Sequence, residues 1–240
     1  MIKLYENIFK RKSIRKYIKE ELSSEQQSAI MDFAENTVSL YPDIKTRIKI
    51  VPSSEIGGLL TVKAPQYLLI YSEKEKGALV NAGFILQQID LYLSSQGIGS
   101  CWLGMGKPKI TSFDGLEYVI MLAVGKPAEQ IYRESITDFN RKTLPEISQG
   151  EDVRLEPARL APSARNGQPW FFVCTDRSIN IYRKKPGGLL NSVFDRLTQI
   201  DIGIVMAHLM IAGEKNGIAF TFDDNEDLQA KADYVPVGVV

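Results

Sequence analysis

Two long apolar segments, each bounded by glycines, constrain the fold of this 240-residue chain more than any other feature. One runs from Gly83 to Gly97 and the other from Gly203 to Gly217, so both pairs of glycines are separated by the same 120 residues. Each segment has the length of a helix of about four turns, and each ends in Gly-Ile, which is typical of a helix that stops at glycine. We therefore predict two related halves of mixed helix and strand, joined near residues 140–155.

The rest of the hydrophobic pattern also mixes helices and strands, which predicts an α+β protein. Ser23 and Ser24 precede a Glu-Gln-Gln run, a capping-box pattern that predicts a helix reaching about Asn36. Residues 128–150 are rich in charge and predict a long loop, so we expect a first half over residues 1–150 and a second over residues 151–240. The other expected helices span residues 2–10, 77–96 and 202–211, and the expected strands span residues 46–51, 67–71, 118–124 and 170–173.

The overall composition argues against nucleic-acid and membrane partners. The chain has 29 basic and 29 acidic residues, so no net positive field attracts nucleic acid or anionic lipid. No apolar run approaches the roughly 20 residues that span a bilayer. Glu6 lies where a signal peptide needs its apolar stretch, so a cytoplasmic location is expected. Cys101 and Cys174 show neither a metal-binding spacing nor a disulfide framework, and no metal is expected.

The first candidate for chemistry is the basic segment Arg11-Lys12-Ser13-Ile14-Arg15. In an extended conformation Arg11, Ser13 and Arg15 alternate with their neighbours and point the same way. Two guanidinium groups and a hydroxyl on one side suit a phosphate monoester, which carries a charge of about −1.5 to −2. The alternative is an ordinary basic turn exposed to solvent.

The second candidate is the glycine-rich segment after the first apolar helix, from Gly97 to Gly106. It is not a dinucleotide-binding motif, because Trp102 occupies the third glycine position and the segment follows a helix instead of opening one. It is not a Walker A motif, because Cys101 stands where the first glycine is required. A backbone turn that lies against a flat ring remains, with a tight turn that packs Trp102 into the core as the alternative.

The third candidate is a loop of prolines, small residues and amides, from Leu160 to Pro169. It precedes the run Trp170-Phe171-Phe172-Val173, which predicts a buried strand. Alanine and glycine in the loop leave room for a ligand close to the backbone, and Ser163 and Asn166 offer hydrogen bonds. The loop therefore suits a large, flat ligand.

These three segments resemble those of the FMN-dependent nitroreductase family. Residues 162–170 are similar to its Pro-Ser-x-x-Asn-x-Gln-Pro-Trp loop, residues 11–15 to its Arg-Arg-Ser-x-Arg segment, and residues 97–104 to its Gly-Leu-Gly-x-x-Trp-x-Gly segment. The resemblance implies a three-layer sandwich with a central, mostly antiparallel sheet. It also implies three sets of contacts to FMN. The phosphate and ribityl chain would contact Arg11, Lys12, Ser13 and Arg15. The edge of the ring would contact Trp102, Leu103 and Gly104, and the face of the ring would contact Pro162, Ser163, Ala164 and Asn166.

A further basic stretch follows a strand end that also resembles the family. Residues 125–129 are similar to its Gly-x-Pro-x-Glu segment, after which a basic segment returns to the FMN phosphate. The resemblance implies that Arg141 or Lys142 supplies this additional cation. The alternative is that both are exposed linker charges.

The order of the segments departs from the family pattern. In an ordinary nitroreductase the Pro-Ser-x-x-Asn loop comes early in the chain, and each FMN site of the homodimer combines segments of two subunits. Here the loop lies in the second half, which has no basic segment at its start. The resemblance therefore implies a fused pseudo-dimer with one working FMN site, and it leaves open whether the chain stays a monomer or forms a homodimer.

The implied activity is hydride transfer from NADH or NADPH to a flat conjugated small molecule, of the nitroaromatic or quinone type, by a ping-pong mechanism. FMN carries this chemistry at N5, so no catalytic side chain is expected. His208, the only histidine, is interpreted as a residue of the helix core. Two alternatives stay open: a non-catalytic protein that stores FMN or senses redox state, and an enzyme that degrades flavin with oxygen.

Overall fold

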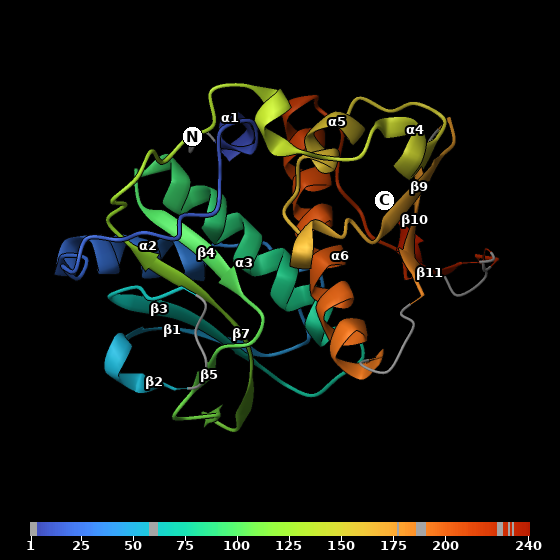
Figure 1. Ribbon diagram of the computed structural model, residues 1–240. Coiled ribbons are helices and arrows are strands. Elements are labelled where there is room, and N and C mark those ends of the chain that lie inside the picture. Colours follow the sequence, from blue (N-terminus) through green and yellow to red (C-terminus); the bar gives the residue numbers. More distant parts are fainter. Residues whose placement is uncertain are drawn as a thin grey trace.

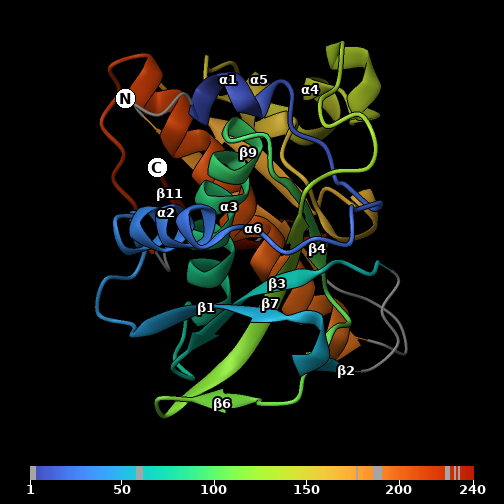
Figure 2. The same cartoon turned by 90° about the vertical axis from the view of Figure 1, so that its left-hand side faces the viewer.

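Two sheets lie on either side of a pair of long helices in the computed structural model, which describes residues 4–57, 62–176, 178–185, 191–224, 228–229, 231 and 233–240. The helices are α3 (Ala78–Ser95) and α6 (Asn191–Lys215), and they run side by side through the middle of the molecule (Figure 1; Figure 2). α3 packs on the first sheet and α6 on the second. The expected α+β class with mostly antiparallel strands is confirmed, and the strands are divided between the two sides of the helix pair.

The first sheet is antiparallel throughout and has the order β1-β3-β7-β4, with β6 paired to β7. Its central strand β3 is buried along its whole length, which explains its nearly continuous apolar sequence. The predicted strands at 46–51, 67–71 and 118–124 are confirmed here. The strands are β1 (Thr46–Pro52), β3 (Gln66–Ser72), β4 (Gly99–Leu103), β6 (Ser112–Phe113) and β7 (Leu116–Gly125), while β2 (Ile56–Gly57) and β5 (Lys107–Pro108) form a separate pair.

The second sheet has the order β11-β10-β9-β8, and only the β8–β9 pair is parallel. The strand predicted at 170–173 is confirmed as β9 (Trp170–Cys174). β11 was not predicted, because Pro236 and Gly238 are poor strand formers, and its pairing with β10 overrides that local preference. The other strands of this sheet are β8 (Ser148–Gln149), β10 (Ile179–Lys184) and β11 (Tyr234–Val239).

The shorter helices cover the ends of this arrangement. The helix predicted after Ser23 is α2 (Ser24–Glu35), and its capping box is complete because Ser23 and Gln26 each bond the other's backbone N–H. The N-terminal helix is α1 (Leu4–Ile8). The loop expected over residues 128–150 is largely irregular, but it contains α4 (Leu144–Ile147) and β8, and α5 (Leu155–Arg159) follows.

α3 and α6 touch each other through two glycines. A side chain on Gly83 would overlap the carbonyl oxygen of Ile200, and one on Gly203 would overlap the carbonyl oxygen of Val80. The two contacts are reciprocal, since Val80 and Ile200 are themselves separated by 120 residues. Only glycine allows two helix backbones to approach this closely.

α6 is much longer than the helix expected over residues 202–211. Its stretch Ser192–Lys215 is long and apolar enough to cross a membrane, by length and composition alone. In the fold, however, 78% of the most apolar window of this helix is buried. Packing between α3 and the second sheet therefore accounts for its apolar character.

Candidate functional site

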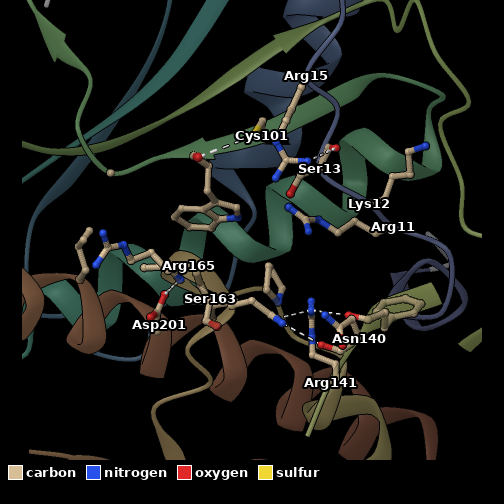
Figure 3. A pocket seen from close by; sticks show the side chains of 18 of the residues that line it. Arg11, Lys12, Ser13, Arg15, Cys101, Asn140, Arg141, Ser163, Arg165 and Asp201 are labelled. Carbon is tan, nitrogen blue, oxygen red and sulfur yellow. Dashed lines mark hydrogen bonds between the residues drawn. The ribbon is translucent and has the colours of Figure 1, made fainter. Parts of the chain in front are cut away.

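A cavity of about 1150 Å³ opens where five segments meet: the extended N-terminal segment, the end of β4, residues 129–141, the loop at 162–166 and the first half of α6 (Figure 3). Eleven of the thirteen residues expected at the site line this cavity. The two that do not are Leu103 and Lys142. The fold thus brings three sequence motifs that lie far apart in the chain to one place.

The N-terminal segment is fixed in an extended conformation beside β4. The Ile14 N–H donates to the Ser100 carbonyl oxygen at 2.9 Å, and the Ala128 N–H donates to the Lys16 carbonyl oxygen at 2.9 Å. A side chain on Gly99 would collide with Ile14, so glycine at that position allows the segment to lie against the strand. The consequence is that Arg11, Lys12, Ser13 and Arg15 all line the cavity (Figure 3).

Arg11 is the most deeply buried cation of the site, with 3% of its surface exposed. Its Nε donates to Asp90 Oδ2 at 2.6 Å, and the Ser100 hydroxyl donates to the other oxygen of the same carboxylate. Arg11 Nη2 is buried and has no hydrogen-bond partner among the residues that the structure describes. The guanidinium is therefore held in one orientation with a donor left over, which is the arrangement that an anionic ligand would complete.

Arg133 is a cation of the cavity that the sequence did not indicate. Its guanidinium donates to the Arg11 carbonyl oxygen and lies 4.1 Å from the centroid of the Phe139 ring. Burial lowers the pKa of both Arg133 and Arg141 to about 10, and the charge of nearby Arg11 adds to the effect on each. These groups crowd positive charge into one part of the cavity, and a bound anion would relieve that repulsion.

Arg141 ties this basic part of the cavity to the loop at 162–166. Its Nη1 donates to Asn166 Oδ1 at 2.5 Å, and its Nε and Nη2 donate to the carbonyl oxygens of Ala161 and Leu160 at 3.1 and 3.3 Å. Lys142 points away from the cavity, and its Nζ donates to the Gly167 carbonyl oxygen at 3.1 Å. Of the two expected cations, Arg141 lines the cavity and Lys142 supports the loop from behind.

The loop is held in a strained conformation. Arg165, Asn166 and Gln168 have φ angles of 54°, 56° and 48°, values that side-chain-bearing residues seldom adopt. The Gln168 N–H donates to Ser163 Oγ at 2.9 Å, and the surrounding bonds of Arg141 maintain the shape. Pro162, Ser163, Ala164 and Asn166 consequently present a compact surface of small groups to the cavity.

The end of β4 and one face of α6 form the apolar wall. Trp102 and Gly104 line the cavity, whereas Leu103 points to the opposite face of the sheet and is buried in a second apolar cluster. A side chain on Gly104 would lie 2.9 Å from a methyl carbon of Leu197. Glycine therefore keeps a narrow space open between the strand end and the helix.

Two buried titratable groups on α6 differ in their relation to the cavity. Asp201 lines it with 4% of its surface exposed, and burial raises the pKa of its carboxyl group to about 7. His208 lies in the helix core, and burial lowers its pKa to about 4. Its Nδ1 is 2.9 Å from the Pro157 carbonyl oxygen, so this histidine joins helices instead of facing the cavity.

The chain was compared with families, curated proteins and solved structures. A family model described as "Putative TM nitroreductase" matches residues 3–213. No curated protein sequence matches the chain.

Three solved structures illustrate the likeness. A "putative nitroreductase" from Thermotoga maritima aligns with a TM-score of 0.65 at 21% identity, covering 98% of this chain and 93% of that chain. A nitroreductase family protein from Clostridium difficile gives a TM-score of 0.50 at 18% identity, covering 62% and 98%. An FMN-dependent nitroreductase from Clostridium difficile gives 0.45 at 18% identity, covering 55% and 95%. The first two show a shared fold, and the family match over most of the chain goes further: this protein belongs to the nitroreductase family of the Thermotoga maritima type.

Proposed function

We propose that this chain is an FMN-dependent oxidoreductase that passes hydride from NADH or NADPH to a flat conjugated acceptor, of the nitroaromatic or quinone type, in a ping-pong reaction. The observation that carries the proposal is the two-sided character of the cavity. Arg11, Lys12 and Arg141 lie towards one side, while Arg165 and Asp201 lie towards the other, next to the apolar wall (Figure 3). FMN has the same division, with an anionic phosphate at one end and a flat ring at the other.

The basic side fits a phosphate. Arg11 Nη2 is a buried donor without a partner, and Lys12, Ser13 and Arg15 line the cavity beside it. A phosphate monoester can accept several charge-assisted hydrogen bonds, each contributing about 1.5–3 kcal/mol when shielded from water. Arg141 would act indirectly as well, by holding Asn166 and the loop in place.

The apolar side fits a ring. Trp102, Gly104, Leu197 and Ile200 line this side of the cavity, and the loop at residues 162–166 lines a further side. When bound, FMN would supply the hydride chemistry at N5, which no side chain of this cavity can provide. The chain's own residues would bind the phosphate, orient the ring and keep water from one of its faces.

A single site formed by two related halves is part of the proposal. The reciprocal contacts of Gly83 and Gly203 support an internal duplication, because a shift of 120 residues exchanges one contact for the other. A second pair is similar: Gln88 Nε2 donates to the Val38 carbonyl oxygen at 2.8 Å, and His208, 120 residues later, lies 2.9 Å from the carbonyl oxygen of Pro157, which is 119 residues after Val38. The basic segment occurs only in the first half, so one working site per chain is expected.

The first experiment is to reconstitute the purified protein with FMN, remove free flavin and measure the absorption spectrum and the ratio of flavin to protein. One FMN per chain, with NADH or NADPH oxidation coupled to reduction of a quinone, is the expected result. Bound FMN without turnover would indicate a storage protein, and loss of the flavin ring during aerobic reduction would indicate flavin degradation.

The phosphate contacts can be tested with a charge-matched pair of double variants. Lys12→Gln with Arg15→Gln removes two cavity cations, and FMN affinity should fall at least about tenfold for each bond lost. Lys45→Gln with Arg47→Gln removes two cations that pair with exposed Asp114, and FMN affinity should not change. Equal FMN affinity in the two double variants would contradict the assignment.

A further inference from the structure

Asp201 is a buried carboxyl group in the cavity wall, and none of the contacts proposed for FMN involves it. It projects from α6 towards the loop that carries Ser163 and Arg165 (Figure 3). Its Oδ1 accepts a hydrogen bond from the Ala164 N–H at 2.9 Å. It therefore touches the same loop backbone that is expected to lie against the flavin.

Holding the loop does not require a carboxyl group. Asn81 stands 120 residues earlier, at the corresponding position of α3, and its Oδ1 accepts hydrogen bonds from the Leu40 and Tyr41 N–H groups at 2.9 and 3.2 Å. An amide oxygen thus holds a loop backbone in the first half. At neutral pH a carboxyl group costs more to bury than an amide, because it must either carry its charge into the interior or take up a proton, so its presence at 201 needs a reason beyond the hydrogen bond.

Burial favours the protonated form of Asp201. Leu197, Ile200 and Ile204 of the same helix line the cavity with it, and burial raises the pKa of the Asp201 carboxyl to about 7. The Ala164 N–H lowers the pKa by a smaller amount. No ion pair of Asp201 occurs among the described residues. The charged side chains that line the cavity with it are Arg11, Lys12, Arg15, Glu129, Arg133, Glu134, Asp138, Arg141 and Arg165, and helices α3, α5 and α6 add Asp90, Glu156, Arg159, Asp195, Arg196, Glu214 and Lys215.

We propose that Asp201 is the proton donor to the acceptor in the oxidative half-reaction. The inference rests on the proposed function, since the hydride, which carries the two electrons, comes from NADH or NADPH by way of FMN. A quinone that takes up hydride is left with negative charge on an oxygen. The O–H bond of Asp201 breaks, its proton bonds to that oxygen, and the electron pair stays on the carboxylate, which takes a proton from solvent before the next turnover.

Asp201 is better placed than bulk water to protonate an acceptor that lies against this wall of the cavity. Leu197, Ile200 and Ile204 keep the wall around the carboxyl apolar, so a proton source inside the wall is needed where an acceptor lies against it. A general acid with a pKa near the working pH combines availability of the proton with driving force for its transfer. Such a donor contributes about 100-fold or more to the step that it serves.

The test compares Asp201→Asn, which keeps the acceptor for the Ala164 N–H, with Asp195→Asn on the same helix. Asp195 pairs with Arg183 and does not line the cavity. Each protein is loaded with FMN and reoxidised either by a quinone, which needs a proton, or by ferricyanide, which takes single electrons and needs none. In Asp201→Asn the quinone rate should fall about 100-fold while the ferricyanide rate and FMN affinity stay the same, and Asp195→Asn should behave as the parent protein.

A direct readout of the proton accompanies the kinetics. Infrared difference spectra of the FMN-free parent protein should show a carboxylic acid that titrates near neutral pH and is missing from Asp201→Asn. Equal slowing with both acceptors, no slowing at all, or no such carboxylic acid would each overturn the inference. Failure of the parent protein to bind FMN or to oxidise NADH and NADPH would instead defeat the proposed function, and this is visible before any variant is made.

Discussion

Replacing Arg11 tests how the basic side of the cavity is built into the core. The Asp90 carboxylate is fully buried, and the Arg11 side chain is 4% exposed. Their hydrogen bond is 2.6 Å long, and within the described part of the chain the Ser100 hydroxyl is the donor to the other carboxylate oxygen. Arg11→Ala therefore leaves a negative charge in the apolar core with a single neutral partner.

The expected cost follows from that burial. Breaking a buried ion pair by removing one partner destabilises a protein by about 3–5 kcal/mol. Total stabilities are about 5–15 kcal/mol, so Arg11→Ala should remove a large part of the free energy of unfolding. Adding Asp90→Asn removes the uncompensated charge and should restore more than half of the loss. Arg15→Ala, at an exposed cation of the same segment, should cost no more than about 0.5 kcal/mol.

The assay is urea unfolding of the FMN-free protein, followed by circular dichroism and by tryptophan fluorescence. The four proteins are the parent, Arg11→Ala, Arg11→Ala with Asp90→Asn, and Arg15→Ala. If the free energies of unfolding of Arg11→Ala and Arg15→Ala differ by less than about 1 kcal/mol, the buried pair of Arg11 and Asp90 does not stabilise the fold as expected. If the expected order is found, loss of FMN in an Arg11 variant cannot be read as loss of a phosphate contact alone.

Two further outcomes are expected. Gly203→Ala places a methyl group on the Val80 carbonyl oxygen, so it should lower the midpoint of thermal unfolding. Gly217→Ala should lower it far less, because the new methyl group has open space and only the backbone strain of φ 69° opposes it. Equal midpoints for the two variants would contradict the close contact between the helices. Burial raises the pKa of Asp201 from 3.8 to about 7, so its contribution to stability is fully present below pH 3.8 and is lost as pH rises through 7. At about 1.4 kcal/mol per unit the whole loss is about 4 kcal/mol, of which about 3 kcal/mol falls between pH 5 and pH 7. Guanidinium unfolding at pH 5 and pH 8 should show that difference for the parent protein and not for Asp201→Asn.

Much of the cavity could be predicted because it is built from short segments whose local composition dictates their shape. Alternation in an extended segment places Arg11 and Arg15 on one side, and the small residues around Ala164 produce a compact loop. The apolar helices with their glycines predicted the central pair of the fold. In each case the pattern that predicts the feature lies within a short stretch of sequence, although bonds to distant segments hold the feature in place.

The remaining residues of the site depend on contacts between remote segments. Arg133 reaches the cavity because its N–H donates to the Lys10 carbonyl oxygen at 2.8 Å. The irregular stretch around Arg133 has no periodic sequence pattern from which that contact could be predicted. Asp201 faces the cavity because the crossing at Gly203 sets the rotation of α6. Leu103 was predicted at the site but lies elsewhere. Adjacent side chains of a strand point to opposite faces of the sheet, so Leu103 is buried in a different cluster from the residues next to it in the motif.

The walls of the cavity come from distant parts of one polypeptide, and this determines how ligand affinity depends on protein concentration. A site divided between two subunits falls apart when the protein is diluted, since its affinity for a ligand is tied to the concentration of the dimer. Here the basic segment at residues 11–15 and the loop at residues 162–166 stay joined at any concentration. Ligand affinity should therefore be the same in micromolar and nanomolar solutions of this protein.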